Sequence, residues 1–373
     1  MAGTDSTEGL NLMVVIRPIA LKDLDQLCVL ATQTGFGLTT LPRDADLLSE
    51  RIQESQASFQ RMSRRPRGET YLFVMEDLAT HQVVGTCGIV SKVGGFEPFY
   101  AYKVETEQFD SEMLNVHKSI RTLHLVEDHN GPCEIGSLFL APSHRRGGNG
   151  RLLSLSRFVF MAQHRQRFDP LVIAEMRGVI DDRGRSAFWD AIGKHFFEID
   201  FPKADYLSMV NKKFIADLMP KHPIYSVILP PEAQAVIGEV HEDTRPALKM
   251  LRDEGFALSG MVDIFEAGPV VQCARDAIRT VRQTSSATLV EITESPVNSI
   301  RCVVGTTADG FRACVGDVER IGESGIRLDA EAAAALAARP GDLIAFAPLR
   351  PEALSAQETH DVADESLHRQ PVD

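Results

Sequence analysis

This 373-residue chain lacks several features, and each absence excludes a class of protein. Its six cysteines are scattered and form no C-x-x-C pair, which argues against a disulfide framework or a zinc site and favours reduced thiols. No stretch approaches the roughly 20 apolar residues of a membrane span, and residues 1–12 lack the basic and apolar segments of a secretion signal. We therefore expect a cytoplasmic protein without a bound metal and without a membrane partner.

Basic residues are fewer than acidic ones. The chain has 39 Lys and Arg and 52 Asp and Glu, which gives a formal net charge of −13. The negative electrostatic potential that this charge creates argues against a nucleic-acid partner and favours the approach of a cationic small molecule. An acidic surface is also common among soluble enzymes that bind no cation, and this plainer interpretation is the more frequent one, so both stay open.

The length and the 44% hydrophobic content are sufficient for one large domain and one smaller one. We expect a flexible N-terminus at residues 1–12, a large domain at 13–280, a small β-rich domain at 281–350 and a flexible tail at 351–373. The tail has too little apolar content to order itself.

Apolar periodicity in the first half predicts a mixture of strands and helices. Residues 13–19 predict a strand, and residues 20–32 and a segment from Asp44 onward predict two helices. The apolar stripe of the second helix indicates packing rather than function; its members are Leu48, Ile52, Ser55 and Phe59. Residues 71–75 and 83–90 predict an antiparallel hairpin, residues 94–131 an irregular region, and residues 134–140, 151–167 and 171–176 a strand, a helix and a strand.

From residue 287 the pattern changes to short strand-like runs separated by Gly, Asn and Asp. The predicted strands cover residues 288–292, 300–304, 311–315, 326–328 and 343–349, and an alanine-rich helix covers 330–338. The fold class expected for the whole chain is α+β with a mixed sheet and a smaller C-terminal β-rich domain.

A glycine-rich turn, residues 145–150, separates the strand ending at Leu140 from the helix beginning near Arg151. Its glycines allow close backbone approach and positive φ, while the helix terminus attracts an anion such as a pyrophosphate, with added charge from Arg145 and Arg146. Glycine content alone is also compatible with a simple flexible connection.

Two other phosphate motifs do not fit this turn. A P-loop ends in Gly-Lys-Ser/Thr, whereas Gly150 precedes Arg151 and Leu152, and a dinucleotide fingerprint normally follows the first strand. The turn instead resembles the Arg/Gln-x-x-Gly-x-Gly/Ala pyrophosphate turn of the GNAT superfamily of N-acyltransferases, which Arg145, Gly148 and Gly150 match.

The wider sequence resembles the arginine N-succinyltransferases from about residue 13 to about residue 273, and more weakly beyond. The segments that carry the resemblance are residues 152–158, 174–181, 188–189, 193–194, 218–225 and 233–241. The resemblance implies an acyl-CoA N-acyltransferase fold, succinyl-CoA as the acyl-donor substrate with no permanently bound cofactor, and L-arginine as acceptor. It also implies a homo-oligomer or pairing with a related subunit.

The resemblance assigns functional residues as well. The main chain of Leu138 falls on the succinyl-CoA contact, His241 on the proton donor, and the turn on the coenzyme A diphosphate site. The turn residues expected to bind coenzyme A are Arg145, Arg146, Gly148, Asn149 and Gly150. An imidazole pKa of about 6.5 lies below the roughly 8.5 of a thiol, so His241 can serve as an acid to the thiolate or as a base to the amine.

Arginine binding requires carboxylates for the guanidinium and a cation for the substrate carboxylate. Glu175 and Arg177 are the candidates, with Asp181 and Asp182 as further ones, although a structural ion pair is the more common explanation for any one of them. His144 and His222 are weaker catalytic candidates with ordinary loop explanations.

Three functions remain open at this point. The first is succinyl transfer to arginine. The second keeps the fold but prefers ornithine as acceptor or acetyl as donor. The third is a non-catalytic partner subunit that binds coenzyme A.

Overall fold

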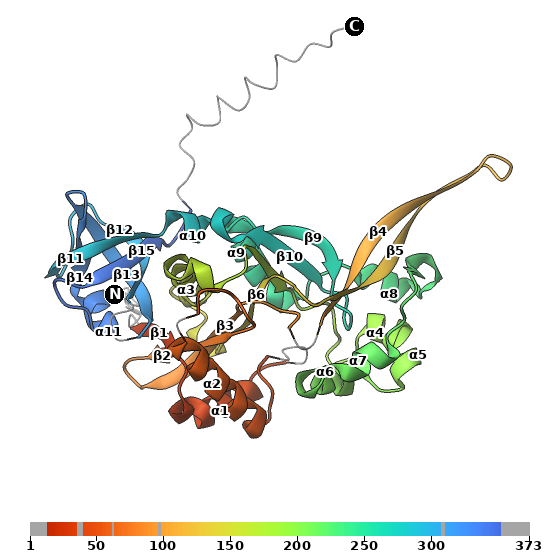
Figure 1. Ribbon diagram of the computed structural model, residues 1–373, viewed down its shortest axis with the longest axis horizontal. Coiled ribbons are helices and arrows are strands. Elements are labelled where there is room, and N and C mark those ends of the chain that lie inside the picture. The colour runs from red at the N-terminus through yellow and green to blue at the C-terminus, as the bar shows by residue number, and fades with distance from the viewer. Residues whose placement is uncertain (1–12, 36–39, 62, 96–97, 307–309, 352–373) are drawn as a thin grey trace, which may run out of the picture.

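The computed structural model describes residues 13–35, 40–61, 63–95, 98–306 and 310–351 (Figure 1). The expected flexible N-terminus, and all of the expected flexible tail except Pro351, lie outside the described residues. Within the described part, no helix has the length and apolar character needed to cross a membrane.

The fifteen strands of the described residues join in one continuous hydrogen-bonded sheet. The ten strands outside the C-terminal part are, in spatial order, β1 (Val14–Pro18), β2 (Thr70–Asp77), β3 (Gln82–Val90), β6 (Cys133–Leu140), β7 (Leu171–Glu175), β10 (Pro269–Ala274), β9 (Ala257–Val262), β4 (Phe99–Ser111), β5 (Val116–Asp128) and β8 (Ile224–Tyr225). Neighbours pair antiparallel except β6 and β7, which are parallel. The predicted hairpin of β2 and β3 is confirmed.

Three helices pack on the part of this sheet near β1, β2 and β3: α1 (Leu24–Thr32), α2 (Ala45–Gln60) and α3 (Asn149–Gln163). Asp44 caps α2 by accepting hydrogen bonds from the main-chain N–H groups of Asp46 and Leu47, as N-cap carboxylates commonly do. Helix α3 is buried on almost every side, and Phe160 packs edge-on against Phe73 and Phe311. The stripe from Leu48 to Phe59 is part of this core, so its interpretation as packing is confirmed.

A second core lies beside β4 and β9 and centres on Trp189, the single tryptophan of the chain. The short helices that follow β7 are α4 (Ala187–Ala191), α5 (Gly193–Phe197), α6 (Phe201–Val210), α7 (Lys213–Leu218), α8 (Pro231–Val236), α9 (Arg245–Asp253) and α10 (Arg279–Gln283). Helices α4 to α8 contribute to the second core, whereas α9 and α10 pack on the first.

The prediction of an irregular region at residues 94–131 is wrong. This segment contains β4 and β5, two 13-residue strands paired along their whole length, and Figure 1 shows the pair extending far beyond the body. Polar residues alternate with few apolar ones over its outer half, so the hydrophobic pattern that identifies a half-buried strand is absent there.

The C-terminal part forms a small barrel from β11 (Ser285–Thr293), β12 (Ile300–Thr306), β13 (Arg312–Ile321), β14 (Gly325–Asp329) and β15 (Leu343–Pro348). The ring closes because β12 pairs with both β13 and β15. Helix α11 (Ala330–Leu336) packs against β13, and β1 joins the barrel to the large sheet through Ile16 opposite Ala313. The five predicted strands, the predicted helix and the α+β class are confirmed.

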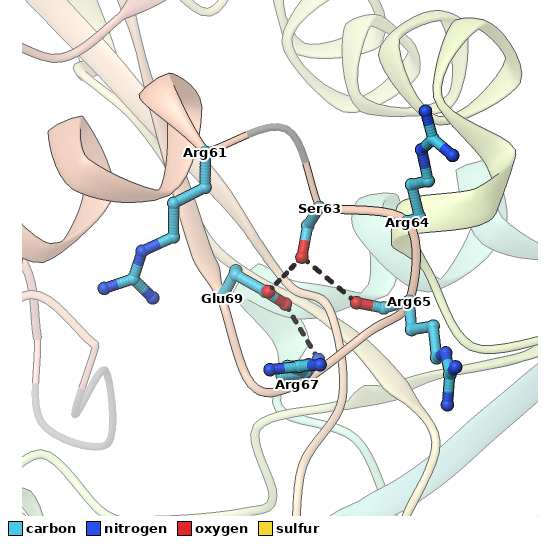
Figure 2. Close-up of a pocket in the computed structure, with 6 residues that line it drawn as sticks. All are labelled: Arg61, Ser63, Arg64, Arg65, Arg67 and Glu69. Carbon is cyan, nitrogen blue, oxygen red and sulfur yellow. Dashed lines mark hydrogen bonds between the residues drawn. The ribbon is translucent and has the colours of Figure 1, made fainter.

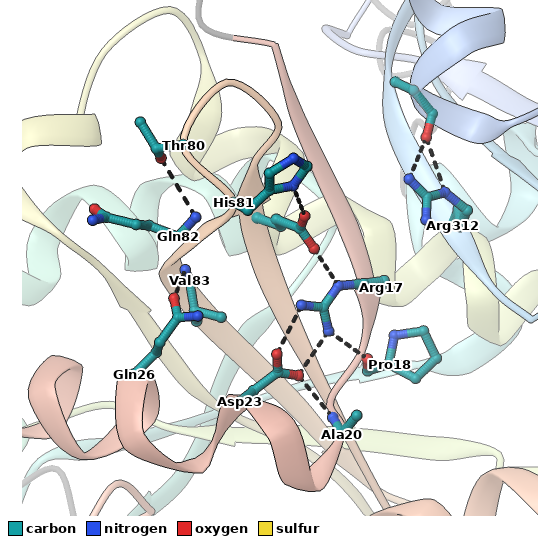
Figure 3. A network of polar contacts seen from close by, with 12 residues as sticks. Arg17, Pro18, Ala20, Asp23, Gln26, Thr80, His81, Gln82, Val83 and Arg312 are labelled. Carbon is teal, nitrogen blue, oxygen red and sulfur yellow. Dashed lines mark hydrogen bonds and ion pairs between the residues drawn. The ribbon is translucent and has the colours of Figure 1, made fainter.

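A polar network fixes β1 and the turn that follows it to the sheet (Figure 3). The Arg17 guanidinium on β1 forms ion pairs with Asp23 at 2.7 Å and with Glu76 on β2 at 2.6 Å. Asp23 is almost fully buried and also accepts a hydrogen bond from the main chain of Ala20. The pair with Arg17 therefore compensates a charge that burial alone would penalise.

Candidate functional site

The glycine turn joins β6 to the N-terminus of α3. Gly147 and Gly148 have φ of +61° and +85°, and Gly148 is the N-cap residue of the helix. A left-handed φ is costly for residues with a Cβ, which explains both glycines. The N–H groups of Gly147, Gly148, Gly150 and Arg151 find no acceptor among the described residues. The turn thus presents free donors at a positive helix terminus, the arrangement that binds anions.

Side chains next to the turn hold it in place. The Arg145 Nε donates to the main-chain oxygen of Leu140 at 2.9 Å, and the buried Asn149 amide donates to the main-chain oxygen of His144 at 3.1 Å. His144 in turn contacts the buried carboxylate of Asp77 at 3.2 Å. Asn149, His144 and Arg145 therefore have structural partners, and the side chains of Arg145 and Arg146 are both exposed.

Strands β6 and β7 pair only at their beginnings, where Cys133 lies opposite Val172 and Glu134 opposite Ile173. Beyond these two pairs β6 continues to Leu140 without β7 as a partner. Ser137 has φ of +53°, and the register of β6 against β3 shifts at this point, so β6 carries a bulge directly before Leu138. The main chain around Leu138 is thus available on the side of β7, as a contact with the acyl-donor requires.

His241 is held at the end of β7. Its main-chain N–H donates to the main-chain oxygen of Arg177 at 2.9 Å, and its Nδ1 accepts a hydrogen bond from the Asp243 N–H at 3.2 Å. The ring is 21% exposed. Burial, with the Arg177 cation, lowers the pKa of His241 despite the acidic neighbours Asp243 and Glu242. The neutral imidazole is therefore favoured, with its proton on Nε2 because Nδ1 is an acceptor.

Arg177 follows β7, and one nitrogen of its guanidinium group lacks a hydrogen-bond acceptor in the described structure. Its Nε is buried and has no hydrogen-bond partner among the described residues. Gly35 lies against the guanidinium, since a Cβ at that position would be 3.2 Å from an Arg177 Nη. Burial lowers the pKa of Arg177, while the charges of Glu266, Asp243 and Asp205 oppose that effect.

Glu175, two residues earlier, belongs to a group of acidic side chains that gathers beside the open edge of β7. Burial first, and then the charges of Glu134 and Asp263, raises the pKa of Glu175 well above its ordinary value, and Lys212 opposes the shift. Glu175 is nevertheless among the exposed residues of the described structure, so its carboxylate is accessible to a ligand. Neither Glu134 nor Glu175 makes a hydrogen bond or ion pair with its side chain in the part of the chain described.

Sequence reasoning missed Glu134, Asp263 and Glu266. Asp263 accepts the N–H groups of Phe265 and Glu266, and Glu266 accepts the N–H of Gly178, so both brace the turn between β9 and β10. The positions are far apart in the chain, and only strand pairing brings them together. No local sequence signal could have identified them.

Two other sequence candidates have local roles. Asp181 accepts the N–H groups of Arg183 and Arg185 and forms an ion pair with the Arg185 side chain at 2.8 Å, as a turn residue does. His222 is exposed. The described residues contain no group of His, Cys, Asp and Glu suited to a metal ion.

A separate basic pocket of about 480 Å³ lies at the start of β2, lined by Arg61, Ser63, Arg64, Arg65, Arg67 and Glu69. Strand pairing places it at the end of the sheet where β6 begins, whereas the glycine turn lies where β6 ends. The Glu69 carboxylate holds the Ser63 hydroxyl and the Arg67 N–H, and the guanidinium groups of Arg61, Arg64 and Arg65 point in different directions (Figure 2). They do not converge on one ligand.

Comparison with known proteins identifies the relatives of this chain. Residues 14–280 match the family described as Arginine N-succinyltransferase beta subunit, and residues 285–348 match its C-terminal domain. Arginine N-succinyltransferase from Enterobacter sp. (strain 638) is 44% identical over 351 residues, covering 92% of this chain and 100% of the relative. The enzyme of the same name from Escherichia coli O6:K15:H31 is 47% identical over 76% of this chain and 81% of its own.

A solved structure agrees with these matches. Arginine/ornithine succinyltransferase subunit AI from Pseudomonas aeruginosa superimposes with a TM-score of 0.82 at 32% identity, covering 91% of this chain and 100% of that one. The chain belongs to the arginine N-succinyltransferase family.

Proposed function

We propose that this chain transfers the succinyl group of succinyl-CoA to the α-amino group of L-arginine, giving N2-succinyl-L-arginine and free coenzyme A in arginine catabolism. Family membership along most of the chain supports the reaction. The structural observation that carries it is the pair of left-handed glycines that exposes unpaired N–H groups at the start of α3, next to the unpaired stretch of β6.

The donor is bound in two parts under this proposal. The coenzyme A diphosphate accepts hydrogen bonds from the turn N–H groups at Gly147, Gly148 and Gly150, with charge from Arg145 and Arg146. The thioester then lies along β6, where the main chain near Leu138 holds the acyl group. Donors fixed in this way lower the barrier by holding the reacting atoms together and by stabilising the oxyanion.

The chemical step forms a bond between the amine nitrogen and the succinyl carbonyl carbon and breaks the carbon–sulfur bond. The nitrogen loses a proton and the departing thiolate gains one. His241 is proposed to move this proton, because the lowered pKa keeps its imidazole neutral and able to accept one at neutral pH. The resulting imidazolium then has a proton for the thiolate.

The acceptor is proposed to bind beside β7. The carboxylates of Glu175 and Glu134 lack partners within the described structure and would receive the guanidinium, a planar group with five donors. Arg177, with its unsatisfied Nε, would receive the α-carboxylate. In this proposed arrangement the α-amine lies next to His241, since the His241 main chain donates to the Arg177 main-chain oxygen and the Arg177 charge acts on the imidazole.

A thiol reagent tests the reaction directly. Protein mixed with succinyl-CoA and L-arginine should release coenzyme A, and mass spectrometry should find N2-succinylarginine. Thiol release no faster than the rate without protein would contradict the proposed function.

L-Ornithine is the second acceptor to consider, because the Pseudomonas aeruginosa relative is named an arginine/ornithine succinyltransferase. Ornithine carries the same α-amine and a shorter cationic side chain. Equal kcat/KM for the two acceptors at matched concentrations would show that the carboxylates select a cation rather than a guanidinium.

Family and relative are both described as subunits, so we further propose that the chain functions as part of an oligomer, with a second copy or a related chain. Cytoplasmic location is part of the same proposal, in keeping with six free cysteines.

A further inference from the structure

The β4–β5 pair forms an arm that leaves the body of the molecule (Figure 1). Its base is held in the sheet, since Tyr102 and Lys103 pair with β9 and Thr122 and Leu123 pair with β8. Beyond these pairs, residues 104–121 have only each other as strand partners. At 3.3 Å per residue the free ribbon is about 25 Å long. Isolated two-stranded ribbons are only marginally stable in water, so an arm of this length is expected to have a partner surface.

Apolar side chains follow the arm on its exposed surface. The tip presents Met113 at 90% exposure and Leu114 at 67%. On one face, the Phe109 ring lies 6.0 Å from the Tyr225 ring of β8. The 3-10 turn after Tyr225 adds Ile228, which is 74% exposed. Exposed apolar side chains thus lie both at the tip of the arm and at its base, and exposed apolar surface of this kind marks interaction sites.

The two strands of the arm carry opposite charge. The β4 half and the turn hold four carboxylates and no cation: Glu105, Glu107, Asp110 and Glu112. The β5 half holds Lys118 and Arg121 and no carboxylate, and the Arg121 guanidinium donates to the main-chain oxygens of Gln234 and Ile237. Glu107 and Lys118 share the face of Phe109, because Phe109 lies opposite Lys118 and Glu107 opposite Ile120. Neither Glu107 nor Lys118 forms an ion pair in the described structure.

We propose that the arm is a subunit interface, in which the Phe109 face of one arm packs on the same face of the arm of a second copy. A two-fold axis running along the ribbons places β4 of one copy over β5 of the other, so that each acidic strand meets a basic one. The proposal rests on the oligomer proposed above and assigns its interface to the arm.

A second copy fits this surface better than an unrelated chain, because one arm carries both halves of the charge match. The rest of the surface does not favour self-association, since two chains with a net charge of −13 repel each other. Local compensation between Glu107 and Lys118 of the two copies removes that repulsion where the arms meet.

Measurement of the molar mass of the full chain by light scattering tests the proposal. The wild type should have at least twice the mass of one chain at micromolar concentration. The substitution Ile228→Asp and the double substitution Met113→Asp/Leu114→Asp should each raise the dissociation constant at least tenfold. Val297→Asp is the matched control, because Val297 is 68% exposed on the C-terminal part, and it should leave the mass unchanged. A monomeric wild type, or arm variants with the wild-type mass, would overturn the proposal.

A charge exchange tests the pairing itself. Glu107→Lys and Lys118→Glu should each weaken association, because each homodimer then brings like charges together. An equimolar mixture of the two variants should associate again, since the two substituted strands then face each other with opposite charge, as do the two unsubstituted ones. Glu294→Lys, an exposed charge reversal away from the arm, should change nothing. Failure of the mixture to associate more tightly than either variant alone would contradict the face-to-face arrangement. Because the readout is mass, this result is independent of whether the acyl transfer occurs.

Discussion

The main-chain N–H of His241 donates a hydrogen bond to the main-chain oxygen of Arg177 at 2.9 Å. This bond attaches a histidine more than 60 residues further along the chain to the end of β7, the strand that leaves β6 after two residue pairs. The imidazole, the Arg177 guanidinium and the Glu175 carboxylate therefore belong to one short stretch of the fold. Substitutions there are expected to affect different kinetic constants.

Replacement of His241 by alanine should lower kcat by about 10²- to 10⁴-fold, the usual contribution of a positioned acid or base. Binding of coenzyme A should be unchanged, because the glycine turn does not contact His241 through any hydrogen bond in the described structure. Steady-state kinetics together with calorimetry would measure both quantities. His222→Ala, at an exposed histidine, is the control and should keep the wild-type kcat.

The pH profile should reveal which proton transfer limits the rate. Burial and Arg177 lower the pKa of His241, so the neutral base is fully present above pH 6.5 and is lost as the pH falls through the lowered pKa. With His241 as the base, kcat/KM should be level near pH 7 to 8 and should fall on the acid side, below pH 6.5. A rate that instead declines as the pH rises through this range would assign the limiting step to the imidazolium.

The elements that sequence reasoning predicted well share a clear hydrophobic period or turn residues at their ends. Examples are α2, with its buried stripe, and the barrel strands, which are bounded by Gly, Asn and Asp. The β4–β5 arm lacks the hydrophobic period, and its turn contains no glycine or proline and only one typical turn residue, Asn115 with φ of +47°. Its strands are defined by pairing with each other, which a single-sequence pattern does not reveal.

The residues of the candidate site also divide into those that a local sequence pattern predicts and those that only the fold brings together. The glycine turn is local, so its motif, its φ angles and its helix terminus could be inferred from adjacent letters. His241 could be identified only through the family resemblance, since its position at β7 depends on a hydrogen bond to Arg177. Glu134 and Asp263 come near Glu175 through strand pairing, although they lie 41 and 88 residues away from it along the chain. No spacing rule connects such positions.

Gly148→Asp should raise the KM for succinyl-CoA about tenfold or more. A side chain at φ of +85° strains the turn, and a carboxylate at the helix N-terminus repels the diphosphate. Gly322→Asp is a matched control, because Gly322 also has positive φ and open space around it but lies in the C-terminal barrel. Equal KM values for Gly148→Asp and the wild type would remove the turn from the donor site.

Glu175→Gln should raise the KM for L-arginine about tenfold and leave the KM for succinyl-CoA unchanged, since loss of one charge-assisted contact to a guanidinium is of this order. The pH dependence of the KM for L-arginine provides a second test. Burial, Glu134 and Asp263 raise the pKa of Glu175, so its carboxylate is protonated as the pH falls through that raised value. The KM for arginine in the wild type should therefore increase toward low pH. The Gln variant should lose this dependence, and an unchanged profile would exclude Glu175 from acceptor binding.

Glu254 and Arg279 form a buried ion pair that connects the end of α9 to α10, and it should contribute to stability rather than to catalysis. Glu254 accepts two bonds from the guanidinium and one from the N–H of Thr280, and its side chain is fully buried. Glu254→Ala should lower the free energy of unfolding by about 3–5 kcal/mol, because it leaves the Arg279 charge buried without a counter-ion. The double variant Glu254→Leu/Arg279→Met should recover part of that loss, since replacing a whole buried pair by apolar groups costs less than breaking it. Chemical denaturation measures both changes.

Glu291→Gln, which breaks the exposed pair with Arg327, is the control and should leave the denaturation midpoint nearly unchanged.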